Sequence, residues 1–429
     1  MASILFGGNG RKDDLVLEGI RVVDPIQGID DVLTLGVEKG VLTRLEPAAQ
    51  RDSRRVCVPA FVDPHVHLRT PGREDEEDIA SGTRAAAAGG YCAILAMPNT
   101  DPVVDSAAVL GSLAERAEVD AEIPVGFFAS ISKGQEGAEL TEMVELAERG
   151  AVGFTDDGRP VQSAGLLRRA LQYNEVTGRQ IAVHCEEPGL SRGGQMHEGA
   201  VSAELGFAGY PSVAESVMVG RDLALAAYEE QPLHVLHVSA RESVEEIRAA
   251  QEQGVAATAE VTPHHLCLTH EAIRNLDANL KMNPPLRSEA DRAALIEALR
   301  DGTIGSIATD HAPHAAFEKE VPFEEAPFGV TGLETAFAVL FTRLVEPGVV
   351  PLATVVERMS AGPAQIYGLE PPRIAIGAPA NLAVIDLEAT WSPSEDGFRS
   401  RSANSWLLGA TLRSKVVTTV ANGKLAYSA

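Results

Sequence analysis

The sequence predicts an α/β protein in which a (β/α)8 TIM barrel carries a small β-sandwich domain formed from both termini. In the middle of the chain, short apolar runs alternate with segments of helical period, as βα units on a parallel sheet do. Eight such runs can be placed, and eight repeats favour a closed barrel over an open sheet. Both ends of the chain instead alternate short β-like runs with Gly, Asp and Pro turns. With 429 residues, 45% of them hydrophobic, the chain can bury the core of a barrel.

The predicted domain boundaries lie where this pattern changes. Residues 1–58 are predicted to form the N-terminal part of the β-sandwich, residues 59–368 the catalytic barrel, and residues 369–429 the C-terminal part of the sandwich. The predicted barrel strands are, in order, VPAFVD, YCAILAMPN, IPVGFFAS, AVGFTDD, QIAVHCE, LHVLHVS, AATAEVTPHH and IGSIATDH. Segments of helical period fall between them, among them DIASGTRAAAAGG, SVEEIRAAQEQG and DRAALIEALRDG.

The composition excludes several classes of function. A formal net charge of −25 argues against nucleic acid and anionic membrane surfaces as partners. No apolar run is long enough to span a bilayer and the N-terminus has no secretory pattern, so we expect a soluble, cytoplasmic protein. The four cysteines are widely spaced and predict neither a disulfide framework nor a zinc knuckle. We expect them to be small buried hydrophobic residues.

Polar side chains end nearly every predicted barrel strand, and in a (β/α)8 barrel these ends converge on the face that carries active sites. His65 and His67 end the first run, and side chains at i and i+2 of a strand point the same way, so the two imidazoles can share one metal ion. Other runs end on further donors: Asp156 and Asp157, His184, His237 and Asp310. Imidazoles and carboxylates suit zinc and related divalent ions, and a bridging carboxylate permits two ions about 3.5–4 Å apart. Strand parity does not decide which of the paired aspartates would bridge.

The motifs of this sequence, taken together, resemble those of a known family. HVHLRTPG, MPNT, GFTDDG, HCEEP, GGQMHEG, LHVS, EVTPHHL, NPPLR and ATDHAPH, in this order, are similar to motifs of the amidohydrolase superfamily, and most closely to those of bacterial class I dihydroorotases. The resemblance extends from about Val22 to about Ile385. It implies that the first metal is bound by His65 and His67, the second by His184 and His237, that Asp157 bridges them, and that Asp310 touches the first metal and is the catalytic proton shuttle.

The activity implied by the resemblance is reversible hydrolysis of (S)-dihydroorotate to N-carbamoyl-L-aspartate, the ring-closing third step of de novo pyrimidine biosynthesis when run backwards. Two divalent ions, expected to be zinc, would generate hydroxide near neutral pH and polarise the ring carbonyl. Histidine and aspartate ligands also suit manganese or cobalt. Asp310 would take the proton of the attacking hydroxide and deliver it to the leaving amide nitrogen.

The resemblance also implies the substrate-binding residues. Arg69, Asn99 and His314 match the family's carboxylate-binding positions, and an arginine offers a planar fork to a carboxylate. Asn283 is expected to meet the pyrimidine ring. The segment after His314 is long for a βα loop, and its residues Pro327, Phe328 and Gly329 match the family's substrate-adjacent loop. We expect this loop to act as a lid over the bound ring.

Two rival functions remain to be weighed. A hydantoinase, dihydropyrimidinase or allantoinase shares the fold and the H-x-H motif, but a lysine usually bridges its metals, and its uncharged substrates give no need for Arg69 with Asn99. A silent dihydroorotase-like scaffold for aspartate carbamoyltransferase would lack metal ligands, whereas every ligand is present here. Homodimerisation and binding of aspartate carbamoyltransferase are left open by the sequence.

Four further histidines and a glycine-rich segment are expected to have no role in the chemistry. His234 has the opposite strand parity to His237 and is predicted to pack outside the barrel. For His264 and His265 we favour structural hydrogen bonding over metal binding, and His311 directly follows Asp310 and should point elsewhere. The N-terminal GGNG has no strand before it and no helix after it, so it does not predict a phosphate loop.

Overall fold

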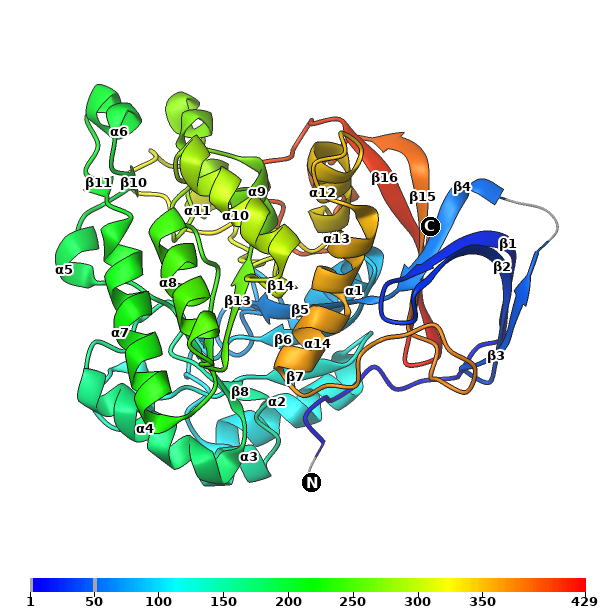
Figure 1. The fold of residues 1–429 in the computed structure, drawn as a ribbon, viewed down its shortest axis with the longest axis horizontal. Coiled ribbons are helices and arrows are strands. Elements are labelled where there is room, and N and C mark those ends of the chain that lie inside the picture. The colour runs from blue at the N-terminus through cyan, green and yellow to red at the C-terminus, as the bar shows by residue number, and fades with distance from the viewer. Residues whose placement is uncertain (1–2, 49–51) are drawn as a thin grey trace.

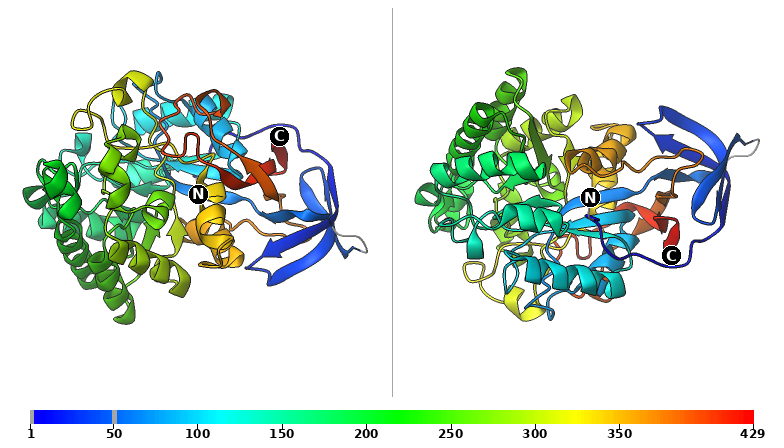
Figure 2. Two further views of the ribbon diagram at one scale, coloured as in Figure 1. Left: turned by 90° about the horizontal axis from the view of Figure 1, so that it is seen from above. Right: turned by 90° about the horizontal axis from the view of Figure 1, so that it is seen from below.

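The computed structural model describes residues 3–48 and 52–429 and combines a body of parallel strands and helices with a sheet built from both ends of the chain (Figure 1). Of the predicted N-terminal domain, residues 1–2 and 49–51 lie outside the described residues. The body and the terminal sheet lie side by side in all three views (Figures 1 and 2). Within the described ranges, no helix is both long and apolar enough to cross a membrane.

Two sheets of parallel strands form the centre of the body. The order of the three-stranded sheet is β5-β6-β7, and that of the five-stranded sheet is β14-β13-β12-β9-β8. Isolated parallel bridges join Ala129 to Phe154 and Val66 to His311, so the two sheets meet at both edges and their strands form a ring. The strands of this ring are β5 (Phe61–Val66), β6 (Tyr91–Ala96), β7 (Val125–Phe127), β8 (Gly153–Phe154), β9 (Gln180–Val183), β12 (Leu233–Val235), β13 (Ala257–Val261) and β14 (Ser306–Ile307).

Seven of these strands lie within a predicted apolar run, and β5 begins in the first run, VPAFVD, and continues three residues beyond it. These strands carry buried side chains on both faces, which is why their sequences are apolar rather than alternating. One face packs on the surrounding helices in the main core cluster, and the other contributes to a smaller interior cluster with Leu95, Phe128, Ala182 and Tyr367. The parallel order explains why the carboxyl ends of all these strands come together.

Helices surround the ring, and their ends carry recognisable signals. In α10 the Ser288 side chain accepts from the Asp291 backbone N–H, and Asp291 in turn bonds back to the Ser288 backbone, which is a capping box. The helix then ends at Gly302, whose φ of 93° suits glycine. The helices are α1 (Ile79–Ala88), α2 (Ala107–Asp120), α3 (Met143–Glu148), α4 (Ala164–Thr177), α5 (Pro188–Ser191), α6 (Ala200–Leu205), α7 (Val213–Glu229), α8 (Arg241–Glu252), α9 (Pro263–Cys267), α10 (Glu289–Asp301), α11 (Ala316–Lys319), α12 (Ala336–Leu340), α13 (Leu352–Met359) and α14 (Ala361–Ile366).

Both termini contribute to one seven-stranded sheet with the order β17-β16-β15-β4-β1-β2-β3. Strand β4 is its junction, because it pairs in parallel with β1 and antiparallel with β15. A second core cluster, which includes Val22, Leu35 and Leu382, packs on this sheet. The strands are β1 (Leu15–Asp24), β2 (Ile29–Glu38), β3 (Val41–Pro47), β4 (Asp52–Pro59), β15 (Leu382–Trp391), β16 (Leu412–Ala421) and β17 (Lys424–Ser428), and a separate pair, β10 (Met196–His197) with β11 (Gly209–Tyr210), lies between β9 and β12 in the chain.

The four cysteines are free, as expected. Cys57, Cys92 and Cys185 are buried, and Cys267 is partly buried. Burial raises the pKa of the Cys92 and Cys267 thiols to about 12, which keeps them protonated at neutral pH.

Candidate metal centre and substrate pocket

Asp157 lies between two pairs of histidines. Its Oδ2 atom is 3.5 Å from His65 Nε2 and 3.6 Å from His67 Nε2. Its other oxygen, Oδ1, is 3.4 Å from His237 Nε2 and 3.6 Å from His184 Nδ1. Each carboxylate oxygen therefore faces one histidine pair, which is the arrangement that a bridging ligand of two cations requires.

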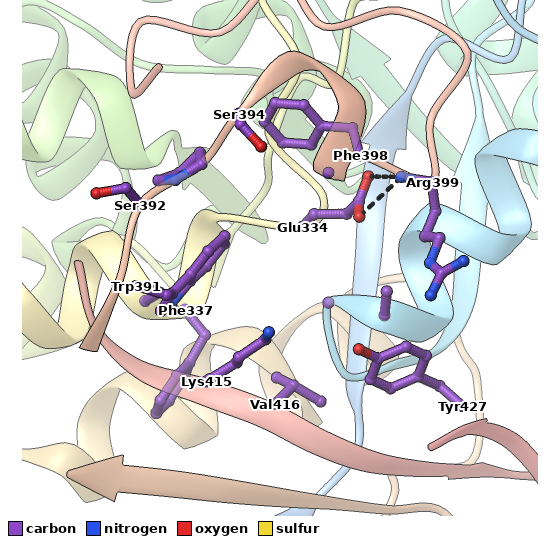
Figure 3. A pocket seen from close by; sticks show the side chains of 15 residues that line it. Glu334, Phe337, Trp391, Ser392, Ser394, Phe398, Arg399, Lys415, Val416 and Tyr427 are labelled. Carbon is purple, nitrogen blue, oxygen red and sulfur yellow. Dashed lines mark hydrogen bonds between the residues drawn. The ribbon is translucent and has the colours of Figure 1, made fainter. Parts of the chain in front are cut away.

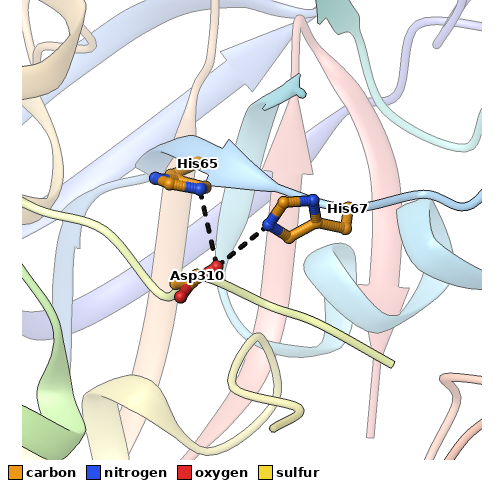
Figure 4. Close-up of side chains that lie close together, drawn as sticks. All are labelled: His65, His67 and Asp310. Atoms are coloured by element: carbon orange, nitrogen blue, oxygen red, sulfur yellow. Dashed lines mark hydrogen bonds and ion pairs between the residues drawn. The ribbon is translucent and has the colours of Figure 1, made fainter. Parts of the chain in front are cut away.

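Asp310 completes the cluster on the side of the first pair (Figure 4). Its Oδ1 lies 3.0 Å from His67 Nε2 and 3.5 Å from His65 Nε2. The ligand atoms of His65, His67 and Asp310 lie within 4.8 Å of one another, and so do those of His65, Asp157 and His237. Each of these two groups, which share His65, thus brings three donors close enough together for a divalent ion.

The neighbouring Asp156 points away from the histidines. Its carboxylate accepts hydrogen bonds from the backbone N–H groups of Ile131 (2.8 Å) and Ser132 (3.1 Å), and from the Ser132 hydroxyl. These bonds hold the loop after β7 against the end of β8. The geometry therefore leaves Asp157 as the member of the pair that faces the cluster.

The backbone is strained where strands end at this cluster. His237, Asp310 and Arg69 have positive φ values of 31°, 48° and 56°. Such values are rare outside glycine and cost on the order of 1 kcal/mol or more each, so the surrounding structure must hold them in place. All three residues follow the carboxyl end of a ring strand within a few positions.

Three histidines of the cluster also form a hydrogen bond through the ring nitrogen that faces away from Asp157. The sequence did not predict these three acceptors. His65 Nδ1 lies 2.8 Å from Glu260 Oε1, His67 Nδ1 lies 2.9 Å from Asn99 Oδ1, and His184 Nε2 lies 3.1 Å from Glu186 Oε2. These acceptors hold the proton on the nitrogen that they contact. In the neutral imidazoles, the opposite nitrogens, which face Asp157, are then unprotonated and suited to bind a metal.

The donor set fits divalent cations. His65 Nε2 is buried and has no hydrogen-bond partner among the described residues, although it faces two carboxylates at 3.5 Å. Four imidazoles and two carboxylates are the ligands that zinc and similar ions prefer. An unpartnered, buried nitrogen in such surroundings costs free energy unless a cation occupies the centre.

Charges within the cluster shift the pKa values of its members. Burial alone would raise the pKa of Asp157, but the neighbouring imidazoles, His65 foremost, hold it well below its usual range. Burial opposes protonation of His65, yet Asp157 and Asp310 raise its pKa well above the usual value. Asp310 behaves like Asp157, since His65 and His67 outweigh burial and lower its pKa. Both carboxylates are therefore ionised, and a bound cation would displace the proton that they hold on His65.

A cavity of about 380 Å³ opens onto the cluster and is lined by all but one of the predicted site residues. The exception is His65, which is fully buried behind Asp157 and Asp310. Gly158 and Ala312 also line this cavity and were not predicted. The predicted residues along its wall are His67, Arg69, Asn99, Asp157, His184, His237, Asn283, Asp310, His314, Pro327, Phe328 and Gly329.

Arg69 carries the positive charge of this cavity. Its Nε atom donates to the Pro313 carbonyl (3.1 Å) and pairs with Glu76 Oε2 (3.0 Å), and its side chain is 12% exposed. His314 lies next to it, but burial and the charge of Arg69 lower the His314 pKa to about 3, so this imidazole is neutral at pH 7. His314 Nε2 donates to the Phe328 carbonyl at 2.9 Å, which leaves Nδ1 as a buried acceptor that has no hydrogen bond among the described residues and lies 3.5 Å from Glu318 Oε2.

Two buried lysines fix the loop predicted as a lid. Lys281 Nζ donates to the carbonyls of Phe323 (2.7 Å) and Glu324 (3.0 Å), and Lys319 Nζ donates to the Pro327 carbonyl (2.7 Å). The loop is thereby held at the rim of the cavity, with Phe328 in its wall. Lid motion stays a prediction.

The other histidines give one correction. His234 does not pack outside the ring of strands as predicted: it is fully buried, its Nε2 lies 3.1 Å from Glu260 Oε2, and its ring contacts Tyr367 in the interior cluster. The parity rule failed because β12 ends at Val235 and the positive φ of His237 reverses the direction of that side chain.

The remaining expectations about histidines are confirmed for two residues. His265 Nε2 donates to the Pro284 carbonyl (3.0 Å) and its Nδ1 lies 2.8 Å from Thr262 Oγ1, which is structural hydrogen bonding. His311 points away from the cluster toward Glu77, whose Oε2 lies 3.2 Å from its Nε2. His264 differs, because its Nε2 has no partner among the described residues.

A separate cavity of about 310 Å³ lies where the terminal sheet meets the helical body (Figure 3). Trp391, Phe337 and Tyr427 form its aromatic walls, and Glu334 accepts from the Arg399 backbone N–H inside it. None of the predicted site residues lines it. The predicted chemistry therefore belongs to the cavity at the strand ends.

Comparison with known proteins supports one family. A family profile described as Dihydro-orotase-like matches residues 54–243. The chain is 43% identical over 422 residues to a dihydroorotase from Geobacter metallireducens, covering 96% of this chain and 99% of that protein. It is 47% identical over 373 residues to a dihydroorotase from Geobacillus thermodenitrificans, covering 87% of each.

Solved structures match in fold. The L-hydantoinase (dihydropyrimidinase) from Arthrobacter aurescens superposes with a TM-score of 0.86 at 24% identity, covering 97% of this chain and 96% of that one. At this identity the likeness concerns the fold alone. The family follows from the sequence relatives, which are similar over nearly their whole length. The chain belongs to the dihydroorotase-like family of amidohydrolases.

Proposed function

We propose that this protein is a dihydroorotase, which hydrolyses (S)-dihydroorotate reversibly to N-carbamoyl-L-aspartate and serves pyrimidine biosynthesis in the cytoplasm. The observation that carries the proposal is the position of Asp157 between two histidine pairs, at the base of a cavity that also contains Arg69. Relatives named dihydroorotase at 43% and 47% identity support it.

The proposed centre holds two divalent ions, for which zinc is our first candidate. His65, His67 and Asp310 would hold one ion, His184 and His237 the other, and Asp157 both. Bound there, the ions supply an activated water near neutral pH and polarisation of the ring carbonyl.

The protein's own groups carry out the proton transfer. In hydrolysis, Asp310 accepts the proton of the attacking water at its carboxylate and returns it to the ring nitrogen as the C–N bond breaks. Ring closure uses the same groups in reverse order. The carboxylate is kept ionised and ready by His65 and His67, which lower the Asp310 pKa.

The cavity wall selects and orients the substrate. Arg69 would offer its Nη groups to the substrate carboxylate, and its Nη2 already lies 3.5 Å from His314 Nε2 at the same wall of the cavity. Asn99, held through its Oδ1 by His67, has its amide N–H groups left to donate. Asn283 would face the pyrimidine ring of the substrate, and its buried Oδ1 has no hydrogen-bond partner among the described residues. Phe328 in the loop would cover the ring, excluding water other than the reacting molecule.

The fold that supports this site is, in our proposal, a (β/α)8 barrel at residues 59–368 with a β-sandwich domain from residues 1–58 and 369–429. The parallel order of the ring strands, closed by the two isolated bridges, supports the barrel. The joint sheet of both termini supports a single appended domain. The residues that line the cavity all come from one chain.

An assay with several rings tests the proposal. Purified protein should hydrolyse L-dihydroorotate and close N-carbamoyl-L-aspartate, and dialysis against a chelator should abolish both reactions until Zn²⁺ is restored. Dihydrouracil and hydantoin serve as controls because they lack the carboxylate. Comparable turnover of either control would assign the protein to the hydantoinase branch instead.

A further inference from the structure

A single buried carboxylate connects both halves of the candidate metal centre. Glu260 lies on β13 and is fully buried. Its Oε1 atom is 2.8 Å from His65 Nδ1 and accepts from the backbone N–H of His237 at 3.4 Å. Its Oε2 atom is 3.1 Å from His234 Nε2. One carboxylate thus contacts a ligand candidate of the first ion and the backbone of a ligand candidate of the second.

The directions of the hydrogen bonds around Glu260 follow from the donors and acceptors present. Thr258 Oγ1 lies 2.8 Å from His234 Nδ1, so a neutral His234 accepts from the Thr258 hydroxyl and donates through Nε2–H to Glu260. Glu260, as a carboxylate, can only accept, and it therefore requires the proton of His65 on Nδ1. A neutral His65 is then unprotonated at Nε2, the buried nitrogen that faces Asp157 and Asp310 without a hydrogen-bond partner among the described residues.

We propose that Glu260 is a positioning residue for the metal centre: it holds His65 in the tautomer and orientation that bind the first ion, and His234 holds Glu260 in turn. The inference rests on the proposed two-metal function. A carboxylate also makes the imidazole a stronger ligand than a neutral acceptor does, because its charge stabilises the Nδ1–H as Nε2 gives up electron density. Loss of such a partner typically weakens metal binding about 10–100-fold.

Substitution of Glu260 by glutamine removes the charge and keeps the shape. In Glu260→Gln the amide presents a donor to one of its two histidine neighbours, so His65 loses either its charged acceptor or its productive tautomer. We expect cobalt titration of the metal-free protein to show one of the two sites weakened about 10–100-fold against a competing chelator, with an altered visible cobalt spectrum. A purely structural Glu260 would change neither the affinity nor the spectrum of the folded protein.

Asp291→Asn is the matched control for loss of a buried carboxylate. Asp291 is 6% exposed and caps α10 while accepting from the Arg241 backbone N–H at 2.9 Å, so its contacts are unrelated to the imidazoles. This control should lower the unfolding temperature and leave the cobalt affinity and spectrum at wild-type values.

A second pair of variants keeps the test decisive if Glu260→Gln fails to fold. The amide nitrogen of glutamine can replace a histidine Nε2–H, so His234→Gln should retain cobalt affinity, whereas His234→Leu should lose it several-fold. Wild-type affinity and spectrum in Glu260→Gln, or equal affinities in the two His234 variants, would overturn the inference while leaving the two-metal function intact. A wild-type protein that binds no cobalt would overturn both.

Discussion

Replacing Arg69 with methionine separates recognition of the substrate carboxylate from the reaction at the ring. Two neighbours already engage Arg69 Nε, the Pro313 carbonyl at 3.1 Å and Glu76 Oε2 at 3.0 Å. A guanidinium has five N–H donors, and apart from a 3.5 Å contact between Nη2 and His314 Nε2 the Nη groups remain to bind a carboxylate through two hydrogen bonds. Each hydrogen bond to a charged group contributes about 1.5–3 kcal/mol, and two at the lower end give about 3 kcal/mol, or roughly 150-fold in kcat/KM.

The assay compares two substrates in two variants. Wild-type protein should favour dihydroorotate over dihydrouracil by roughly a hundredfold or more, because dihydrouracil leaves the polar groups around Arg69 unpaired. Arg69→Met should lose this preference because its kcat/KM for dihydroorotate falls, while its kcat/KM for dihydrouracil stays within a few-fold of the wild-type value. Arg69→Lys, which keeps the charge without the planar fork, should fall in between.

Metal content must be measured beside the rates. Arg69 makes no contact with Asp157 or the four histidines of the cluster, so elemental analysis should find wild-type metal in both variants. An equal loss for both substrates at full metal content would mean that Arg69 supports the chemistry rather than the carboxylate, and our reasoning about selectivity would be wrong.

Further predictions concern the metals, the proton shuttle, the loop and the pH dependence of stability. Elemental analysis should find more than one equivalent of divalent metal per chain, and Asp157→Ala should lose the second; full activity with a single ion would contradict the binuclear centre. Asp310→Asn should lower turnover in both directions by at least ~10²–10⁴-fold with metal retained, and near-normal rates would assign the shuttle elsewhere. Lys281→Met removes the bonds to two loop carbonyls, so limited proteolysis should cut the 320–329 loop faster and KM should rise, whereas unchanged cleavage would show that the loop is held by other contacts. Burial raises the pKa of Asp222 to about 6 against the opposing charge of Arg221, so its contribution to stability is complete below its unfolded pKa of about 3.8 and is lost as the pH rises through 6. Urea unfolding of the metal-free proteins should therefore show that the free energy of unfolding of Asp222→Asn, relative to wild type, rises by up to about 3 kcal/mol between pH 4 and pH 7. A difference between the two proteins that does not change with pH would refute this.

The strands and most of the site could be predicted from the sequence because their causes are local. A parallel strand buried on both faces must be largely apolar, and every ring strand overlaps a predicted apolar run, with β5 alone extending beyond it. Polar residues directly after such runs stand out, which is how His65, Asp157 and Asp310 were found. That these three residues lie in one cluster follows from the parallel order of the strands.

The missed features depend on contacts between distant segments. Glu260 and His65 are 195 positions apart, and nothing near either residue indicates their contact. The signal in hindsight is the acidic residue inside the buried run AATAEV, because a carboxylate in a strand core requires donors. His234 was misplaced because period-two alternation holds only while a strand continues, and β12 stops two residues before His237.

The junction at β4 also sets an order of folding. Its second edge pairs with β15, which begins only at Leu382, so this edge has no partner until almost the whole chain has been synthesised. Such an open edge invites pairing with other nascent chains. Only Ala60 separates β4 from β5, which carries His65. A chain that lacks residues 382–429 would therefore leave the strand leading to the metal centre without its outer support, and damage at the C-terminus would reach the catalytic face through the backbone.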